Sequence, residues 1–455
     1  MDNLIPSFPN AFAPPIRSLL DEINRLIGPI YLVGDAPWCG ILGKPLPNTL
    51  EILVARPLAE CRKRLSRGDI TSAVLGNKHN SLLLPLKEWT HPKILDIATF
   101  RNRPGHPSTL EEDLLHRDLT VNAMAWTWPS GPLVDPFGGR KDLLTGEIRL
   151  VNGSTTLKDN PLRALLFFRF AMQLNRPPNQ EDLILAEQTS LETILPEPIR
   201  SEMDRILALP LADEASQHLL HALCASPITD RILPHFSLFN PRNAASGAED
   251  PWKRILDVTL AITPPGDDEE ISLLDLRWAT LLGGPALLKL SSKEHMEKNL
   301  NQINKHLELF LFSKRRSRRI LSLLRNLNAT TSPSDRQLKR FLQDHVPVEG
   351  VYRILQAINA TDSHLSEEAR VTEDLKFQQI RSRCHILRQA EERLSPNDLA
   401  LSGGEILDLV RRKPGPWLRD LQATLVDLVI KDPSRNRPAE LTNIVQQWIR
   451  QQREI

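Results

Sequence analysis

The chain has 455 residues, and its 57 Lys and Arg residues nearly balance its 56 Asp and Glu residues. This length suggests about three domains, and the near-zero net charge excludes a global positive field, so a nucleic-acid partner must be met by a local basic patch. No apolar run approaches the roughly 20 residues of a membrane span, no secretion signal is evident, and four cysteines without CxxC spacing indicate reduced, buried thiols, so a cytoplasmic location is expected.

The first third of the chain alternates short apolar segments with turn residues, the pattern of a mixed sheet. An amphipathic helix before residue 30 is expected to cover this sheet. We expect strands at residues 30–33, 50–54, 71–75, 81–86, 93–100 and 144–151. Beyond residue 152, long Leu-rich, charge-interleaved segments with short connections predict helices.

A glycine turn joins the first two strands in IYLVGDAPWCGILGKPLPNTLEILVA, residues 30–55. A strand that leads through such a turn into a helix N-terminus aims N–H groups at an anion, which makes Gly34 a candidate phosphate-binding residue. The next strand could hold metal-binding carboxylates two residues apart on one face. At those two positions this chain has Asn48 and Leu50, and strand alternation is expected to point Glu51 away from them.

Three further motifs follow: LEEDLLHRDLTVNAMAW at residues 110–126, LVDPFGGRKDLL at 133–144 and DNPLRALLFFRFAMQLN at 159–175. Together with the glycine turn they resemble the class II tRNA nucleotidyltransferase and bacterial poly(A) polymerase family, whose patterns include LxxDLxRRDFTxNA and EDPxRxxRxxRF. The resemblance implies an α+β fold: a small mixed β-sheet, polymerase-β-like head followed by an all-α neck, body and tail. The expected borders are 1–152 for the head, 153–225 for the neck, 226–395 for the body and 396–455 for an RNA-binding tail.

The resemblance also implies a nucleotide site. Arg101 and Arg117 would contact phosphate and Asp118 would accept from ribose hydroxyls. In the neck, Asn160 and Arg163 stand where the family reads the base, and Asn in place of Asp alters the donor–acceptor set that separates C from A. The full set of expected nucleotide-binding residues is Gly34, Arg101, Arg117, Asp118, Asn122, Asp159, Asn160, Arg163 and Arg169.

The family's metal-binding positions are the main departure. Asn48 is a poor ligand for Mg²⁺ and Leu50 is none. Asp96, on the strand at 93–100, is either a residual site carboxylate or an edge residue of the sheet. No intact catalytic residue, no metal and no resident cofactor is therefore expected; Mg²⁺ and a nucleoside triphosphate belong to the site only if the protein is active.

The body resembles a metal-dependent phosphohydrolase of the HD type in which the ligand positions hold Arg254, Gly283 and Gly284, so no metal is expected there either. The segment FSKRRSRRILSLLR at 312–325 has a dense basic turn, which is either a solvated face or a contact for an RNA backbone. The candidate RNA-binding residues are Lys314, Arg315, Arg316, Arg318 and Arg319.

Two functions remain open. In one, the protein is a catalytically disabled family member that binds RNA (tRNA or another RNA 3′ end), and with it a nucleotide or a protein partner. In the other, it is an active RNA 3′-end nucleotidyltransferase that adds C or A with an atypical metal site. The loss of both metal-binding aspartates favours the first.

Overall fold

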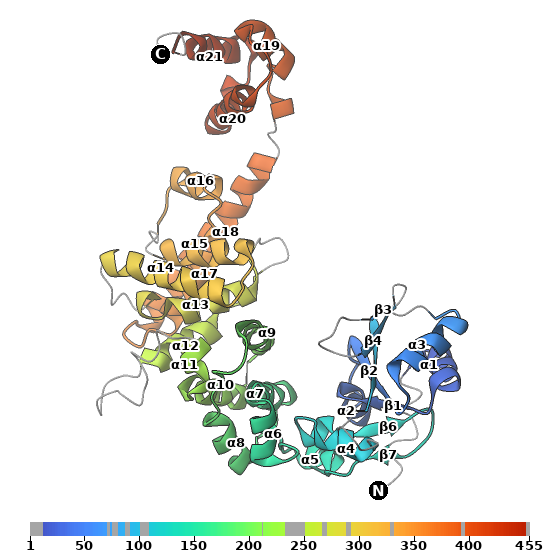
Figure 1. Cartoon of the computed structure of the whole chain (residues 1–455). Coiled ribbons are helices and arrows are strands. Elements are labelled where there is room, and N and C mark those ends of the chain that lie inside the picture. The colour runs from blue at the N-terminus through green and yellow to red at the C-terminus, as the bar shows by residue number, and fades with distance from the viewer. Residues whose placement is uncertain are drawn as a thin grey trace. The chain divides into compact units, whose positions relative to one another are not determined.

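The computed structural model describes residues 12–70, 73–74, 81–86, 92–100, 109–211, 213–232, 251–265, 271–287, 293–327, 332–392 and 396–451. The chain forms two compact units (Figure 1). The first comprises Met1–Leu256 with Leu309–Leu311, and the second comprises Asp257–Glu308 with Phe312–Ile455.

The first unit begins with a mixed sheet, as the sequence predicts. Its strands are β1 (Ile30–Val33), β2 (Thr49–Val54), β3 (Ala73–Val74), β4 (Ser81–Pro85), β5 (Ile94–Thr99), β6 (Ala125–Thr127) and β7 (Leu133–Val134). They lie in the order β3-β4-β5-β2-β1-β6-β7, and β2 pairs with β5 in parallel while the other pairs are antiparallel.

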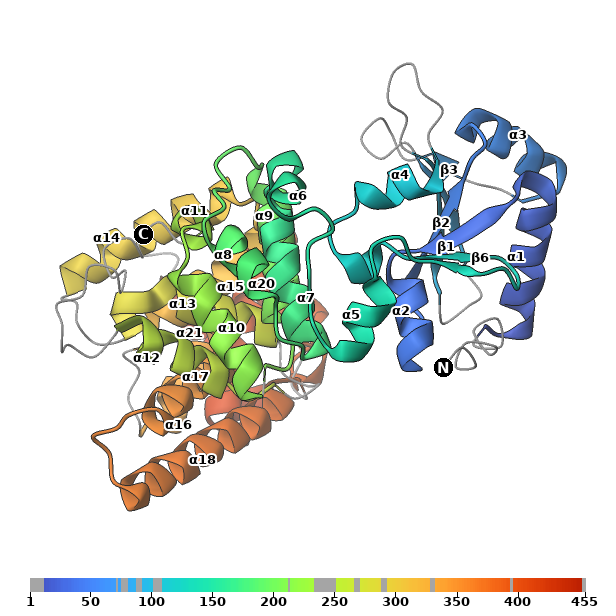
Figure 2. The same ribbon diagram turned by 90° about the horizontal axis from the view of Figure 1, so that it is seen from below.

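Some of the helices up to residue 261 flank this sheet, and the others continue the chain beyond it. They are α1 (Pro14–Ile27), α2 (Asp35–Leu42), α3 (Leu58–Arg67), α4 (Leu110–Leu115), the 3₁₀ turn η3 (Thr120–Asn122), α5 (Gly139–Thr145), α6 (Gly153–Asp159), α7 (Arg163–Leu174), α8 (Gln180–Glu187), α9 (Pro196–Leu207), α10 (Glu214–Ala225), α11 (Ile228–Ile232) and α12 (Pro251–Ala261). Figure 2 shows α1 and α3 on one side of the strands and α4 and α5 on the other.

The alternation of β2 divides its side chains between these two sides. Leu50, Ile52 and Val54 are buried with residues of α1 and α3 in the main core of the head. Leu53 packs instead in a second cluster with Leu110 of α4 on the opposite side. Because neighbouring strand residues point to opposite faces, Glu51 shares the face of Leu53, and this face leads to the site described below.

The prediction of a strand at residues 144–151 is wrong. Leu144 lies within α5, and Ile148 and Leu150 form only isolated bridges, to Pro178 and Leu119. The backbone N–H of Leu150 donates to the buried Asp182 carboxylate at 2.8 Å. The alternating apolar residues thus reflect burial against neighbouring segments of the first unit and not a place in the sheet.

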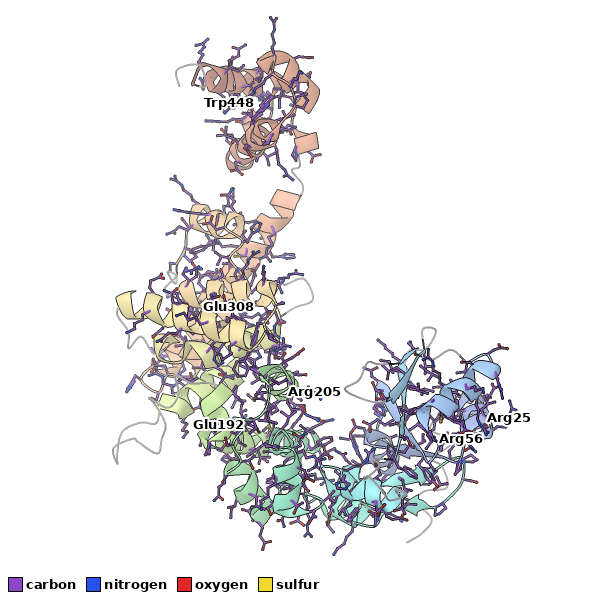
Figure 3. The ribbon with its side chains drawn as sticks, viewed as in Figure 1. Arg25, Arg56, Glu192, Arg205, Glu308 and Trp448 are labelled. Carbon is purple, nitrogen blue, oxygen red and sulfur yellow. The ribbon has the colours of Figure 1, made fainter. Side chains whose placement is uncertain are left out.

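The second unit is helical throughout its described part. Its helices are α13 (Leu273–Leu287), α14 (Lys293–Leu309), α15 (Lys314–Arg325), α16 (Asp335–Gln343), α17 (Val348–Ala360), α18 (Glu367–Glu392), the 3₁₀ turns η6 (Pro396–Asp398) and η7 (Pro433–Arg435), α19 (Gly403–Val410), α20 (Pro416–Lys431) and α21 (Pro438–Gln451). The last three helices enclose a separate apolar cluster. The indole of Trp448, labelled in Figure 3, stacks on that of Trp417. Within the described residues, every helix is too short or too polar to cross a lipid bilayer.

Candidate functional site

A cavity of about 430 Å³ lies in the first unit, where the β1–α2 turn, the start of β2 and the segment before η3 face α7 and α9. Its lining consists of Gly34, Asp35, Pro47, Asn48, Thr49, Glu51, Arg117, Asp118, Asn122, Leu166, Arg169, Phe170 and Arg205. We call this cavity the head–neck pocket. It brings together the expected residues Gly34, Asn48, Arg117, Asp118, Asn122 and Arg169.

The backbone conformation at position 34, in the lining of this pocket, requires glycine. Its φ of 68° is in the region that favours glycine, and a Cβ there would lie 2.8 Å from the carboxyl carbon of Glu51. Asp35 then begins α2 and accepts a hydrogen bond from Trp38 Nε1 at 3.1 Å. Burial raises the pKa of the Asp35 carboxyl above its ordinary value, the Trp38 hydrogen bond opposes this rise, and the nearby Glu51 carboxylate adds to it.

The structure corrects the expected position of the family's carboxylates on β2. Leu50 is fully buried in the core on the far face of the sheet and is not a site residue. Glu51, which was expected to point away, lines the pocket together with Thr49. The residues of β2 that face the site are therefore Thr49 and Glu51, one position later in the chain than Asn48 and Leu50.

Asp96 lies beside Glu51. The two residues are paired in the parallel β2–β5 register, so their side chains emerge on the same face of the sheet. Asp96 is partly buried, and its Oδ1 atom is buried with no hydrogen-bond partner among the described residues. Asp96 does not line the pocket itself.

Arg117 and Asp118 occupy the floor of the pocket. Arg117 Nη1 donates to Glu51 Oε2 at 3.3 Å and to the carbonyl of Asn122 at 3.4 Å, and its Nε lies 3.8 Å from the buried Asp113 carboxylate. Asp118 Oδ1 accepts from the Leu119 N–H at 2.8 Å and from Asn122 Nδ2 at 3.1 Å. Asn122 is 5% exposed, and its Oδ1 atom has no hydrogen-bond partner within the described residues.

The neck wall is built on one buried carboxylate. Glu202 of α9, only 2% exposed, accepts from Arg169 Nε at 2.7 Å and from Arg205 Nη1 at 3.0 Å. The Arg169 guanidinium also lies 4.3 Å from the centre of the Phe170 ring. Arg205, labelled in Figure 3, keeps 63% of its side chain exposed.

Three of the expected neck residues stand apart from the pocket. Arg163 donates to the backbone carbonyls of Thr156, at 3.1 Å, and of His116. Asn160 Oδ1 accepts from the Leu162 N–H at 3.2 Å, and Asp159 lies 3.9 Å from His116 Nδ1. Arg163 thus links the start of α7 to the end of α4, whereas the Asn160 contact is local. The expected Arg101 lies outside the described residues.

The five expected RNA-binding residues of α15 divide into two groups. Arg316 Nε donates to the buried Asp275 Oδ1 at 2.7 Å, and Arg319 Nη1 lies 3.8 Å from Asp275 Oδ2. Lys314, Arg315 and Arg318 are exposed. Only these three of the five expected RNA-binding residues offer an exposed charge. In the region that resembles an HD domain, Gly284 interrupts α13 with a φ of 29° and a ψ of −103°.

The donors in the pocket do not fit a divalent metal ion. Mg²⁺ requires several oxygen ligands, usually with charged carboxylates among them. Three carboxylates line the pocket: Glu51 lies within ion-pair distance of Arg117, Asp118 accepts from Leu119 N–H and Asn122, and Asp35 accepts from Trp38. Among the described residues, no three potential metal ligands lie close enough together to hold an ion. A cation beside Glu51 would be repelled by Arg117.

Sequence reasoning missed four residues of the pocket lining, Thr49, Glu51, Phe170 and Arg205. It also missed Glu202, which holds Arg169 and Arg205 from behind the lining. Glu202 and Arg205 belong to the segment PIRSEMDRIL at 198–207. A signal was present, since an acidic and a basic residue three positions apart share a helix face. Glu51 was missed because the site was assigned to the face of β2 that carries Leu50, whereas Leu50 is buried in the core and Glu51 lines the pocket.

Comparisons with known proteins agree with this architecture. Residues 31–149 match the family described as the poly A polymerase head domain. A multifunctional CCA protein of Nitrosococcus oceani is 41% identical over 196 residues, which is 39% of this chain and 44% of that protein. A CC-adding tRNA nucleotidyltransferase of Geobacter sulfurreducens is 30% identical over 256 residues, which is 55% of each chain.

The matched regions thus span about half the length of these relatives. Among solved structures, a complex of a CCA-adding enzyme with ATP superposes with a TM-score of 0.60 at 17% identity, covering 98% of each chain. A Thermotoga maritima CCA-adding enzyme complexed with tRNA gives 0.57 at 18% identity, again over 98% of each chain, and such identities show a shared fold alone. In its head motifs and its fold the chain is thus similar to the class II tRNA nucleotidyltransferases and poly(A) polymerases, and its residues 31–149 match the poly A polymerase head domain.

Proposed function

We propose that this protein binds RNA and does not transfer nucleotides. One observation carries the proposal: the face of β2 at the pocket presents a single carboxylate, Glu51, which is ion-paired with Arg117, and an uncharged Thr49 beside it. Phosphoryl transfer in such a site depends on charge stabilisation of the triphosphate. The loss of one well-placed electrostatic stabiliser typically costs about 3–4 kcal/mol, near a factor of 10²–10³ in rate.

RNA is the favoured partner for two reasons. The relatives' names describe tRNA nucleotidyltransferases and CCA proteins, and α15 exposes Lys314, Arg315 and Arg318 on one basic turn. Exposed cations contribute to RNA affinity by neutralising phosphates. The four cysteines are buried free thiols, which fits a cytoplasmic location for the protein.

A second candidate function has one observation in its favour. Glu51 and Asp96 are paired in register on the same face of the sheet, and Asp96 keeps a carboxylate oxygen without a described partner. This pair is the one arrangement in the described head from which an atypical nucleotidyltransferase site would be built. The protein would then add C or A to an RNA 3′ end.

Incubation with labelled CTP or ATP and a tRNA that lacks its 3′ end separates the two candidates. We expect no incorporation by the unmodified protein, and metal-dependent incorporation at a rate well above background would establish the second candidate instead. Thr49→Asp tests whether the missing carboxylate belongs at the β2 position that faces the pocket, and Asn48→Asp tests the neighbouring lining position, where the family motif places it. Leu50→Asp is unsuitable because it would bury a charge in the core.

A further inference from the structure

The two faces of α18, a helix of 26 residues, are buried to very different degrees. One face lies in the core of the second unit, because Phe377, Ile380 and Cys384 are at most 3% exposed. The Phe377 ring centre lies 5.9 Å from that of Tyr352 in α17. In Figure 2 the helix runs along the edge of this unit, beside α16 and α17. The opposite face of α18 is therefore turned to solvent.

This solvent face carries a stripe of uncharged side chains. Successive helix residues differ by about 100° in direction, and six exposed residues between 371 and 386 share an arc of about 100°. We call these six residues the α18 stripe: Val371, Leu375, Gln378, Gln379, Ser382 and Ile386. Its three large apolar side chains, at 371, 375 and 386, are 54%, 54% and 63% exposed. Apolar side chains exposed along one face mark a contact surface for another molecule.

The chemistry of the stripe fits another helix. RNA backbones are bound by exposed cations, and helices that lie on anionic lipid are rich in Lys and Arg, whereas the stripe contains no charged side chain. The positions 371, 375, 378 and 382 follow each other at intervals of four, three and four residues. This spacing is typical of helices that pack side by side along their length.

The α18 stripe is complementary to itself. Val371 and Ile386 are equally far from the midpoint between positions 378 and 379, and the same holds for Leu375 and Ser382. Two antiparallel copies of α18 related by a two-fold axis at this midpoint would place Val371 against Ile386. They would also place Leu375 against the small Ser382. An interface between identical chains requires this reciprocity, in which one residue meets a second and the second meets the first.

The charges along α18 favour the antiparallel arrangement. Residues 367–377 contain four acidic and two basic residues, whereas residues 378–388 contain three arginines and no acidic residue. An antiparallel pair sets the acidic half of each copy beside the basic half of the other, and a parallel pair would set like charges together. Opposed helix dipoles add to this preference.

We propose that the α18 stripe is the contact between two copies of this chain, which pack through it as an antiparallel, two-fold symmetric helix pair. The contact lies in the second unit and is independent of the head–neck pocket and its chemistry. A contact of one helix with one helix is at the small end of specific interfaces. The dimer is therefore expected to be reversible and to form at micromolar concentrations.

Sedimentation equilibrium of the full-length protein tests whether it self-associates. The mass should rise from near 51.5 kDa toward twice that value as the protein concentration increases from about 1 to about 200 µM. A mass that stays at the monomer value over this range would overturn the proposal, because the stripe would then have no second copy as its occupant.

Leu375→Glu tests whether the association uses the stripe. Each dimer would then hold two added carboxylates at an apolar contact, so the dissociation constant should rise ten-fold or more. Ile184→Glu on α8 is the matched control, since Ile184 is 52% exposed and lies outside the second unit, and it should leave the constant unchanged. Both native side chains are exposed, so neither change places a charge in the core. A dimer that Leu375→Glu leaves intact, or that both changes weaken equally, would overturn the proposal.

Two further exposed changes test the antiparallel register. Val371→Glu alone and Ile386→Lys alone should each weaken the dimer at least three-fold, because each sets a charge against an apolar side chain. In a mixed dimer of the two variants, one contact joins the added carboxylate to the added ammonium group, and the other contact is native. The mixture should therefore associate at least three-fold more tightly than either variant alone. A mixture that associates no more tightly than the separate variants would overturn the antiparallel pairing.

Discussion

At the scale of single residues, the two neck arginines of the pocket depend on one buried carboxylate. Glu202→Gln removes the charge that holds Arg169 and Arg205. Because removing one partner of a buried pair leaves the other charge uncompensated, we expect a loss of about 3 kcal/mol in the free energy of unfolding. This is the lower end of the usual range, since Arg205 stays largely in water. Urea denaturation followed by circular dichroism measures it.

The matched control for this experiment is Glu197→Gln, on the same helix. Its side chain is 65% exposed and lies 4.0 Å from Arg200, so its removal should change stability by less than about 0.5 kcal/mol. Equal effects of the two substitutions would show that Glu202 does not organise the neck wall.

Asp35 gives the pocket a dependence on pH. Burial raises the pKa of this carboxyl above its ordinary value of 3.8. The stabilisation that comes from the protonated carboxyl is present at a pH below its ordinary pKa, and it is lost as the pH rises through the raised pKa of the folded state. Asp35→Asn keeps an acceptor for Trp38 and has no carboxyl group to ionise. The melting temperature of this variant should therefore exceed that of the unmodified protein by more near about pH 7 than near about pH 4. An advantage equal at both pH values would refute the argument.

The residue scale also shows where sequence reasoning fails. Arg117, Asp118 and Asn122 were predicted as neighbours from one motif, and the structure places all three in one pocket. Leu50 was assigned to the face of β2 that carries the site and Glu51 to the opposite face, and the structure has the reverse. Neighbouring strand residues point to opposite faces, so an error of one position moves a residue from the site to the core. The spacing from Gly34 gives the position of each residue along the chain. The turn between α2 and β2 determines where the strand begins, and therefore which face each side chain takes.

At the scale of elements, a buried carboxylate fastens α15 to α13. Asp275 has a side chain 3% exposed and is the partner of Arg316 and Arg319. Asp275→Asn should lower the free energy of unfolding by about 3–5 kcal/mol, because both guanidinium groups lose their counter-charge in a partly buried setting. Asp335→Asn is the control: its side chain is 63% exposed and pairs with Arg383, and surface pairs contribute at most about 1 kcal/mol.

Prediction of elements from sequence succeeded where local patterns decide the structure. The strand at 30–33 was predicted from its apolar run and the glycine turn after it, and helical structure beyond residue 152 was predicted from Leu-rich, charge-interleaved segments. The segment at 144–151 was misread because its alternating residues are buried by other segments, and alternation alone does not reveal what covers a side chain. The neck's wall of Arg169, Glu202 and Arg205 joins two helices 33 residues apart, a pairing that no local pattern contains.

At the scale of the whole molecule, the formal net charge is +1. A nearly neutral protein attracts RNA through local groups of cations and not through its overall field. The second unit has such a group, because Lys314, Arg315 and Arg318 of α15 are exposed. The neighbouring Arg316 and Arg319 are instead paired with Asp275. RNA affinity should therefore depend on salt through a small number of phosphate contacts.

This expectation is tested by changing Lys314, Arg315 and Arg318 together to alanine and measuring tRNA binding across a salt series. Each phosphate contact contributes roughly 0.7–0.9 to the slope of log K against log salt, so the slope should become shallower by about 2–3. A matched triple change of the exposed Arg62, Lys63 and Arg67 on α3 removes the same charge from the head. If α15 grips the RNA backbone, only the first variant alters the slope; an equal effect of both would mean that the RNA responds to total charge alone.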